Sequence, residues 1–95
     1  MRHGEYKQPG GKLVVVDFDV EDSLLRNVEV SGDFFLEPPE ALSRITGALE
    51  GAASESAEND LAGLVAASVA EDELIGITPA GIAIAVRRAL AGEEA

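Results

Sequence analysis

Apolar residues alternate with polar residues in the first half of the chain, and this period of two predicts strands. Residues 13–21 place apolar side chains on one face, and residues 24–31 continue the pattern after a turn at Asp22-Ser23. Gly32-Asp33 ends the second strand, and residues 34–36 form a short third strand. The inward set of the first strand is Val14, Val16, Phe18 and Val20.

The second half of the chain has the period of helices. Pro38-Pro39 opens a first helix, because proline in a first turn leaves no N–H unpaired. Residues 58–70 form a second helix. Thr78 is the N-cap of a third, Pro79 is its first residue, and Gly92 follows its end. The three apolar stripes are Leu42, Ile45 and Leu49; Leu61, Leu64, Val65 and Val69; and Ile82, Val86 and Leu90.

Strands followed by helices are typical of an α+β fold. We therefore expect a small antiparallel sheet of two to three strands, with about three helices packed on one face. Residues 1–95 form a single domain, since the chain is long enough for one modest core. Residues 1–9 lack a periodic apolar pattern and are predicted to be a flexible N-terminal arm that carries one aromatic residue, Tyr6.

The charge balance is strongly acidic. Eighteen Asp and Glu residues stand against seven Lys and Arg, for a net charge of −11. Nucleic acid is disfavoured as a partner because phosphate binding requires a positive surface. The surplus indicates either an ordinary acidic surface or adaptation to high cytoplasmic salt, and we favour the second, a halophilic origin. No apolar run is long enough for a membrane span, the chain has no cysteine, and a cytoplasmic protein is expected.

Independent catalysis is not indicated by the sequence. The one histidine, His3, lies in the predicted arm, and no serine has an evident partner to activate it. Asp17 and Asp19 fall on one strand face and could share a cation, but a solvated acidic edge is the simpler interpretation. No phosphate-binding or dinucleotide motif is present. We expect no catalytic residue, no metal and no cofactor bound by this chain alone.

A first candidate site is Pro9-Gly10-Gly11-Lys12. Two glycines let the backbone approach another surface, and their N–H groups can cradle an anion. Lys12 supplies a positive charge, and Lys7 lies on the far side of the bend; these are the only two lysines. The alternative is a plain turn into the first strand, and composition alone favours that alternative.

A second candidate site is Ser31-Gly32-Asp33-Phe34-Phe35. Gly32 permits a close backbone approach or a positive φ, and Asp33 can accept bonds from backbone amides. Phe34 and Phe35 cannot both point inward from one strand, because successive side chains alternate between faces. One ring enters the core, and the other faces a loop, a helix or a partner. The alternative, in which both rings serve the core, stays open.

These two motifs, the hairpin between them, a Pro-Glu-led helix and a final Ile-Thr-Pro-led helix resemble the C-terminal accessory domain of the lipoate–protein ligase A family. The resemblance covers about residues 7–91. Departures from the pattern are few: an extra proline at Pro39, and Ala80-Gly81 where acidic residues are more usual. Neither departure touches the two motifs.

The resemblance implies a role as the stand-alone small subunit of a bipartite ligase, an arrangement found notably in archaea. In this family a catalytic domain binds lipoate and ATP, with Mg²⁺ implied, forms lipoyl-adenylate, and transfers the lipoyl group to a lysine of an acceptor domain. The small domain resembles a lid or buttress for adenylation. The implied partners are the catalytic subunit and, further, a lipoyl-acceptor domain, with no nucleic acid and no membrane.

The expected interface or adenylation-support residues are those of the two motifs: Lys7, Gly10, Gly11, Lys12, Ser31, Gly32, Asp33, Phe34 and Phe35. Lys12 is expected to point toward the partner. Two other functions stay open from the sequence: an independent acidic module for protein interaction or regulation, and a protein that binds a small molecule or metal on its acidic faces.

Overall fold

Three strands form the sheet in the computed structural model, which describes residues 1–70 and 73–92 and, of Phe35, the backbone only. The strands β1 (Arg2–Lys7), β2 (Leu13–Glu21) and β3 (Leu24–Gly32) are antiparallel in the order β1-β2-β3. The helices are α1 (Ala41–Leu49), α2 (Glu58–Ser68) and α3 (Pro79–Ala91). Two short strands, β4 (Phe35–Leu36) and β5 (Leu74–Ile75), pair separately.

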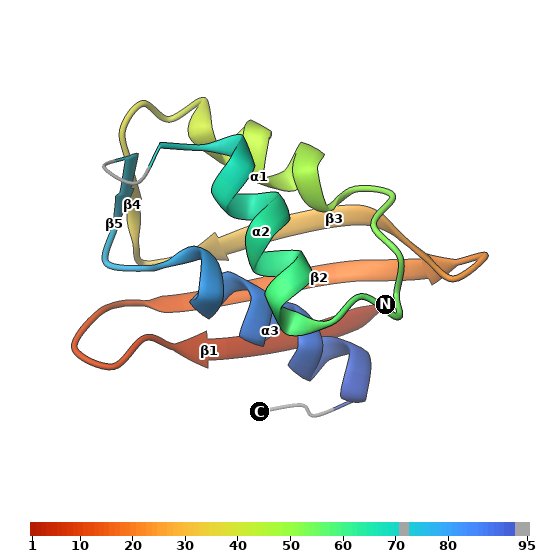
Figure 1. The fold of residues 1–95 in the computed structure, drawn as a ribbon. Helices are drawn as coiled ribbons and strands as arrows, with labels where there is room; N and C mark the ends of the chain where they lie inside the picture. Colours follow the sequence, from red (N-terminus) through yellow and green to blue (C-terminus); the bar gives the residue numbers. More distant parts are fainter. Residues whose placement is uncertain (71–72, 93–95) are drawn as a thin grey trace.

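All three described helices lie on one face of this sheet (Figure 1). The helix α3 packs on β1 and β2, α1 packs on β3, and α2 rests against α1 and α3. The other face of the sheet carries no helix of the described chain. The predicted α+β class, with helices on one face of a small antiparallel sheet, is confirmed.

The prediction of a flexible arm over residues 1–9 is wrong. Arg2–Lys7 pairs with β2 along its whole length, from Arg2↔Phe18 to Lys7↔Leu13. The face of β1 toward the helices carries no aliphatic side chain, so the sequence shows no strand pattern there. Gly4 occupies this face. A Cβ at Gly4 would overlap the backbone of α3 at Ala85 and Ala89, so glycine is what lets this helix lie directly on the strand.

The predicted third strand exists but pairs elsewhere. Residues 35–36 do not join the sheet; they pair with residues 74–75, which the apolar pattern did not mark as a strand. The third helix has the predicted boundaries: the Gly81 N–H donates to Thr78 Oγ1 at 3.0 Å, and Gly92 takes the left-handed conformation at the C-cap. The first helix begins at Ala41, two residues beyond the proline pair.

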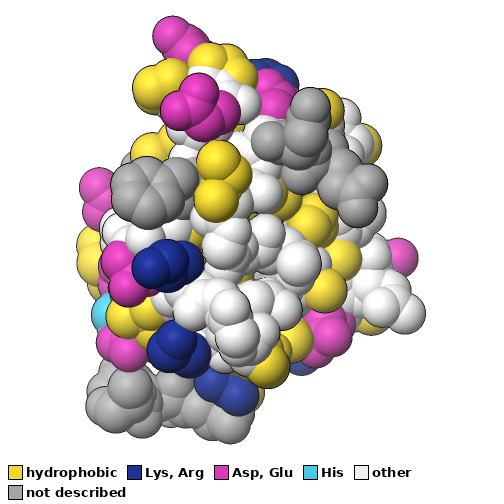
Figure 2. All heavy atoms as spheres, turned by 90° about the vertical axis from the view of Figure 1, so that its left-hand side faces the viewer, with side chains coloured by type: hydrophobic (Ala, Val, Ile, Leu, Met, Phe, Trp, Pro, Cys, Tyr) yellow, Lys and Arg dark blue, Asp and Glu magenta, His cyan; other side chains and the backbone are white. Residues whose placement is uncertain are grey.

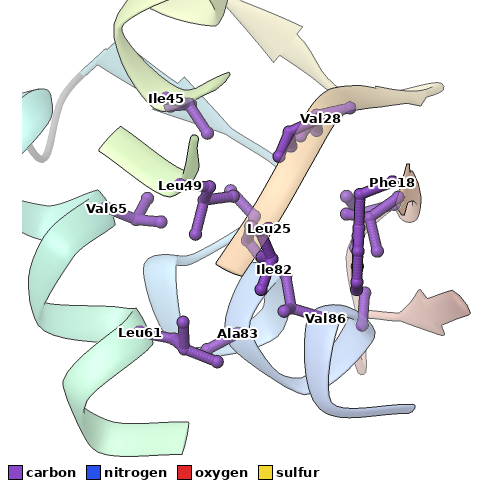
Figure 3. Packing of buried hydrophobic residues seen from close by; sticks show 14 of the residues in the cluster. Phe18, Leu25, Val28, Ile45, Leu49, Leu61, Val65, Ile82, Ala83 and Val86 are labelled. Carbon is purple, nitrogen blue, oxygen red and sulfur yellow. The ribbon is translucent and has the colours of Figure 1, made fainter. Parts of the chain in front are cut away.

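The core fills the space between the sheet and the helices. Figure 3 shows Phe18 and Leu25 of the sheet meeting Leu49 of α1 and Ile82 and Val86 of α3. Every one of these side chains is fully buried. The predicted inward position of Leu64 is wrong: it is 40% exposed on the outer side of α2, because Leu61 and Val65 already cover the contact with the other helices.

Candidate functional site

The two sequence motifs lie together at one end of the sheet. Strand β2 begins directly after the glycine pair, and β3 ends at Gly32, opposite Val14. The Leu13 N–H donates to Asp33 Oδ1 at 2.8 Å, and the Asp33 N–H donates to Leu13 O at 3.3 Å. Asp33 accepts a backbone amide, as its residue type predicts, and it thereby ties one motif to the other.

A third segment, which leads into α3, joins them. The Lys12 N–H donates to Gly76 O at 2.7 Å, and Thr78 Oγ1 donates to Gln8 Oε1 at 3.0 Å. The β4–β5 pair connects the same segment to residues 35–36. We call residues 7–13, 31–36 and 74–78 the three-segment end; Figure 2 views the molecule from this side, where basic and acidic side chains lie next to each other.

The first carbons of the Lys12 side chain pack against Gly76. A Cβ added at Gly76, which has a φ of +90°, would lie only 2.5 Å from Lys12 Cγ. The bare glycine backbone therefore makes room for the lysine stem while the residue as a whole stays exposed. Within residues 1–70 and 73–92, Lys12 Nζ has no hydrogen bond or ion pair. Sequence reasoning did not single out Gly76, although its place between Ile75 and Ile77 ahead of Thr78-Pro79 marks a turn.

Lys7 has a different role, because it stabilises the turn itself. Its Nζ donates to Gly11 O at 2.8 Å, and it faces Leu13 across the β1–β2 pairing. Lys7 and Lys12 therefore bracket the turn as predicted, but only Lys12 is left without a partner in the described chain. One lysine is engaged locally, and the other presents its charge outward.

The two glycines of the turn also differ. Gly10 has a φ of +70° and open space around it, as expected for a turn residue. The Gly11 N–H donates to Gln8 O at 2.8 Å, and the Gln8 N–H donates to Lys12 O at 2.9 Å. These bonds draw the Gly11 amide into the turn, so it is not the donor for an anion. At Gly11 the plain-turn alternative holds.

The second motif is held closely to β2. Gly32 has a φ of +147°, and a Cβ there would overlap Leu13 O and lie 3.0 Å from the Phe34 ring. Ser31 lies opposite Val15 and is exposed. Phe34 is half-buried and packs against the edge of the core. The side chain of Phe35 lies outside the described residues, so its expected direction stays a prediction.

Beside this motif the surface has an apolar groove with a volume of about 380 Å³. Residues at the end of β3 line one part of it. The other side consists of residues that follow along the chain into α1. The lining residues are Val30, Ser31, Gly32, Phe34, Leu36, Pro39 and Leu42. Sequence reasoning counted Leu42 toward the core and did not consider Leu36 or Pro39 as surface.

On the open face of the sheet, His3 bridges two carboxylates. Its Nδ1 lies 2.6 Å from Asp17 Oδ1, and its Nε2 lies 2.8 Å from Glu5 Oε2. The hydrogen bonds to Glu5 and then to Asp17 raise the pKa of His3, because the carboxylates favour the protonated ring. His3 thus joins β1 to β2 rather than lying in a mobile arm, and neither ring nitrogen is left to act as a general base.

One further carboxylate, that of Glu73, fixes a loop that frames the site. Glu73 accepts from Arg44 at 3.0 and 2.7 Å and from the Ala70 N–H at 2.6 Å. The ion pair with Arg44 and the bond from Ala70 lower the pKa of Glu73. This contact anchors the segment just before β5 to α1, so that β5 is positioned to meet β4.

The fold and the site together define the class of protein. It is a two-layer α+β domain with an open sheet face, an exposed lysine whose stem packs against glycine, and an apolar groove. The described residues include no group of three His, Cys, Asp or Glu side chains suited to a metal ion. None of the described helices is both long and apolar enough to cross a membrane.

The fold is similar to that of a chain in a solved structure from Thermoplasma acidophilum. That structure is described as a bipartite lipoate protein ligase and its E2 lipoyl domain, from an archaeal lipoylation system. The likeness covers 90% of this chain and 91% of the other, with 22% sequence identity and a TM-score of 0.65. No protein-family model matches the sequence, and no curated protein matches it. The likeness establishes a shared fold.

Proposed function

We propose that this protein is the accessory subunit of a bipartite lipoate–protein ligase and supports lipoyl-adenylate formation by a separate catalytic subunit. The observation that carries the proposal is the joining of the two motifs at the three-segment end through Leu13 and Asp33. These motifs carry the resemblance to the ligase accessory domain. The fold shared with a chain of the Thermoplasma structure supports the same assignment.

In this proposal ATP, Mg²⁺ and lipoate are bound by the catalytic subunit. The present chain contributes a positive charge at Lys12, whose stem lies against Gly76. An ammonium group near the triphosphate or the forming adenylate stabilises negative charge that develops during adenylation. The acyl-group transfer from lipoyl-adenylate to a lysine of the acceptor domain needs no such help from this chain.

The test is pyrophosphate release from lipoate and ATP, measured with each subunit alone and with both together. We expect no release from this chain alone, little from the catalytic subunit alone, and clear release from the mixture. A catalytic subunit that is equally active without this chain would refute the accessory role. Release by this chain alone would refute the assignment of the chemistry to the partner.

A further inference from the structure

The outer edge of β3, which faces away from β2, is hydrogen-bonded in its first half and, in the part of the chain that the structure describes, has no such bonds in its second half. In the first half the chain covers its own strand edge. The Leu25 N–H donates to Ala52 O at 2.9 Å, and the Gly51 N–H donates to Leu25 O at 2.7 Å. Further along, Glu50 accepts from the N–H groups of Asn27 and Val28, each at 3.0 Å. These bonds leave no template for another strand over residues 24–28.

The second half of this edge has no hydrogen-bonded neighbour strand within residues 1–70 and 73–92, although Val30 as a whole is only 5% exposed. The Asp33 N–H bonds Leu13 O, so Leu13 and Asp33 form a hydrogen-bonded pair of the antiparallel ladder. Bonded and non-bonded pairs alternate along such a ladder. Val30 and Gly32 therefore direct their backbone N–H and C=O groups away from β2. None of these groups has a hydrogen bond outside the sheet within residues 1–70 and 73–92.

The apolar groove lies beside this unpaired half of the edge. Val30 and Gly32 line it on one side, and Phe34, Leu36 and Leu42 line it on the other. An unpaired strand edge beside an apolar groove provides the two elements of strand addition. The backbone of an incoming segment pairs with the edge, and its alternate side chains enter the groove. An unprotected edge of this kind is otherwise an aggregation hazard that proteins cover or charge.

The charges around the groove indicate what the incoming segment carries. Asp33, Glu37 and Glu40 are exposed in the stretches that contribute the groove residues. The nearest cation on α1, Arg44, is already paired with Glu73. A second copy of this chain would bring another net charge of −11 against the first, which opposes pairing. A segment with apolar residues at every second position and Lys or Arg beside them complements both the groove and its rim.

We propose that residues 30–32 of β3 accept an extended apolar segment with basic flanks as an added strand, and that the catalytic subunit supplies this segment. The inference rests on the proposed function for the identity of the partner. It goes further by naming the surface that holds the two subunits together. The groove is the docking site, and Lys12 at the same end of the sheet is left to face the adenylation chemistry.

Two measurements on the complex with the catalytic subunit test this docking site. The first is the dissociation constant by calorimetry for wild type, Leu42→Glu and Leu64→Glu. Both substitutions add one negative charge, but Leu42 lines the groove and Leu64 lies on the outer side of α2. We expect Leu42→Glu to weaken binding by about tenfold or more, as for a central interface residue, and Leu64→Glu to bind as wild type.

The second measurement is hydrogen exchange on the wild-type chain, which does not depend on how any variant folds. The Val30 and Gly32 amides should exchange at least about tenfold more slowly in the complex, because they gain partners. The Val28 amide, already bonded to Glu50, should change little.

Each outcome has a definite meaning. If wild type binds, but Leu42→Glu binds equally well and Val30 gains no protection, the docking site is wrong and the proposed function stands. If wild type does not bind the catalytic subunit, the proposed function fails and the docking site fails with it. A dimer of this chain that protects Val30 in the absence of partner overturns the choice of occupant.

Discussion

The two ends of the sheet differ in how many of their polar groups are bonded within the chain. We call residues 19–28 together with residues 50–54 the bulge end. There the register shifts between Asp17 and Asp19, Asn27 takes a φ of 57°, and the freed amides bond to Glu50. At the three-segment end the loops bond to each other but leave Lys12, the groove and part of β3 open. The chain satisfies its own polar groups at one end and presents a surface at the other.

This difference indicates where function resides in a small domain. The bulge end bonds the outer edge of its strand within the chain, at Leu25, Asn27 and Val28, and these groups are not left for a partner. An end where three distant segments meet combines rigidity with exposed chemistry, because each segment is positioned by the other two. Lys7 has a local hydrogen bond to the turn, and the proposed function therefore rests on Lys12.

The largest expected effect comes from the core behind the bulge end. Leu49 is fully buried between α1 and the sheet, whereas Leu42, two turns earlier, borders the groove. Leu49→Ala should lower the free energy of unfolding by about 2–5 kcal/mol, the usual range for a buried leucine. Leu42→Ala should cost clearly less, since its side chain is only half-buried. Urea denaturation of both variants measures the difference; equal losses would mean that the groove wall is part of the core.

The next effect separates the two ends by function. Lys12→Ala should reduce partner-dependent adenylation by about tenfold, equivalent to about 1.4 kcal/mol in the transition state. Stability should change by no more than about 0.5 kcal/mol, because the charge is exposed. Transfer from pre-made lipoyl-adenylate should be much less affected.

Arg26→Ala is the matched control for Lys12→Ala. It removes one exposed cation from the bulge end, and so changes the net charge equally. Pyrophosphate release should fall for the lysine variant alone. If both variants lose activity equally, the effect is one of net charge and the three-segment end has no special role.

Salt should raise the stability of the isolated chain and slow its association with the partner. The net charge of −11 repels itself, and molar salt shortens the screening length to about 3 Å. The melting temperature of the isolated chain should therefore rise from low salt toward molar KCl. Association with a basic segment at the groove should become slower over the same range. A melting temperature that stays flat would contradict the halophilic origin.

The smallest effect concerns pH at the bulge end. Backbone N–H groups of Val28 and Asn27 lower the pKa of Glu50 in the folded chain. A lowered pKa contributes stability above the unfolded pKa, and this contribution is lost as pH falls through the folded value. Glu50→Gln should therefore lower the melting temperature at pH 7, and the difference from wild type should shrink in acid. A difference that is independent of pH would mean that Glu50 acts through shape rather than charge.

Much of the fold could be predicted because its signals are local. The alternation of Val14, Val16 and Phe18 marks β2, and Thr78 with Pro79 marks the start of α3. Each signal depends on residues within one or two turns, so no knowledge of the partner segment is required. The two motifs were also recognisable, and their residues do meet at one end of the sheet.

The tertiary structure decided what depends on distant segments. Strand β1 carries Gly4 in place of an apolar residue, because α3 lies too close for a side chain, and no period could reveal that. The β4–β5 pair and the contact of Lys12 with Gly76 each join segments about 40 or more residues apart. The groove forms where the end of β3 lies beside the start of α1. The sequence by itself determined β2, β3 and the three helices, and which residues carry charge. Only the packing decided which of those charges are paired and which face outward, because hydrogen bonds and steric contacts between remote segments leave no local period in the chain.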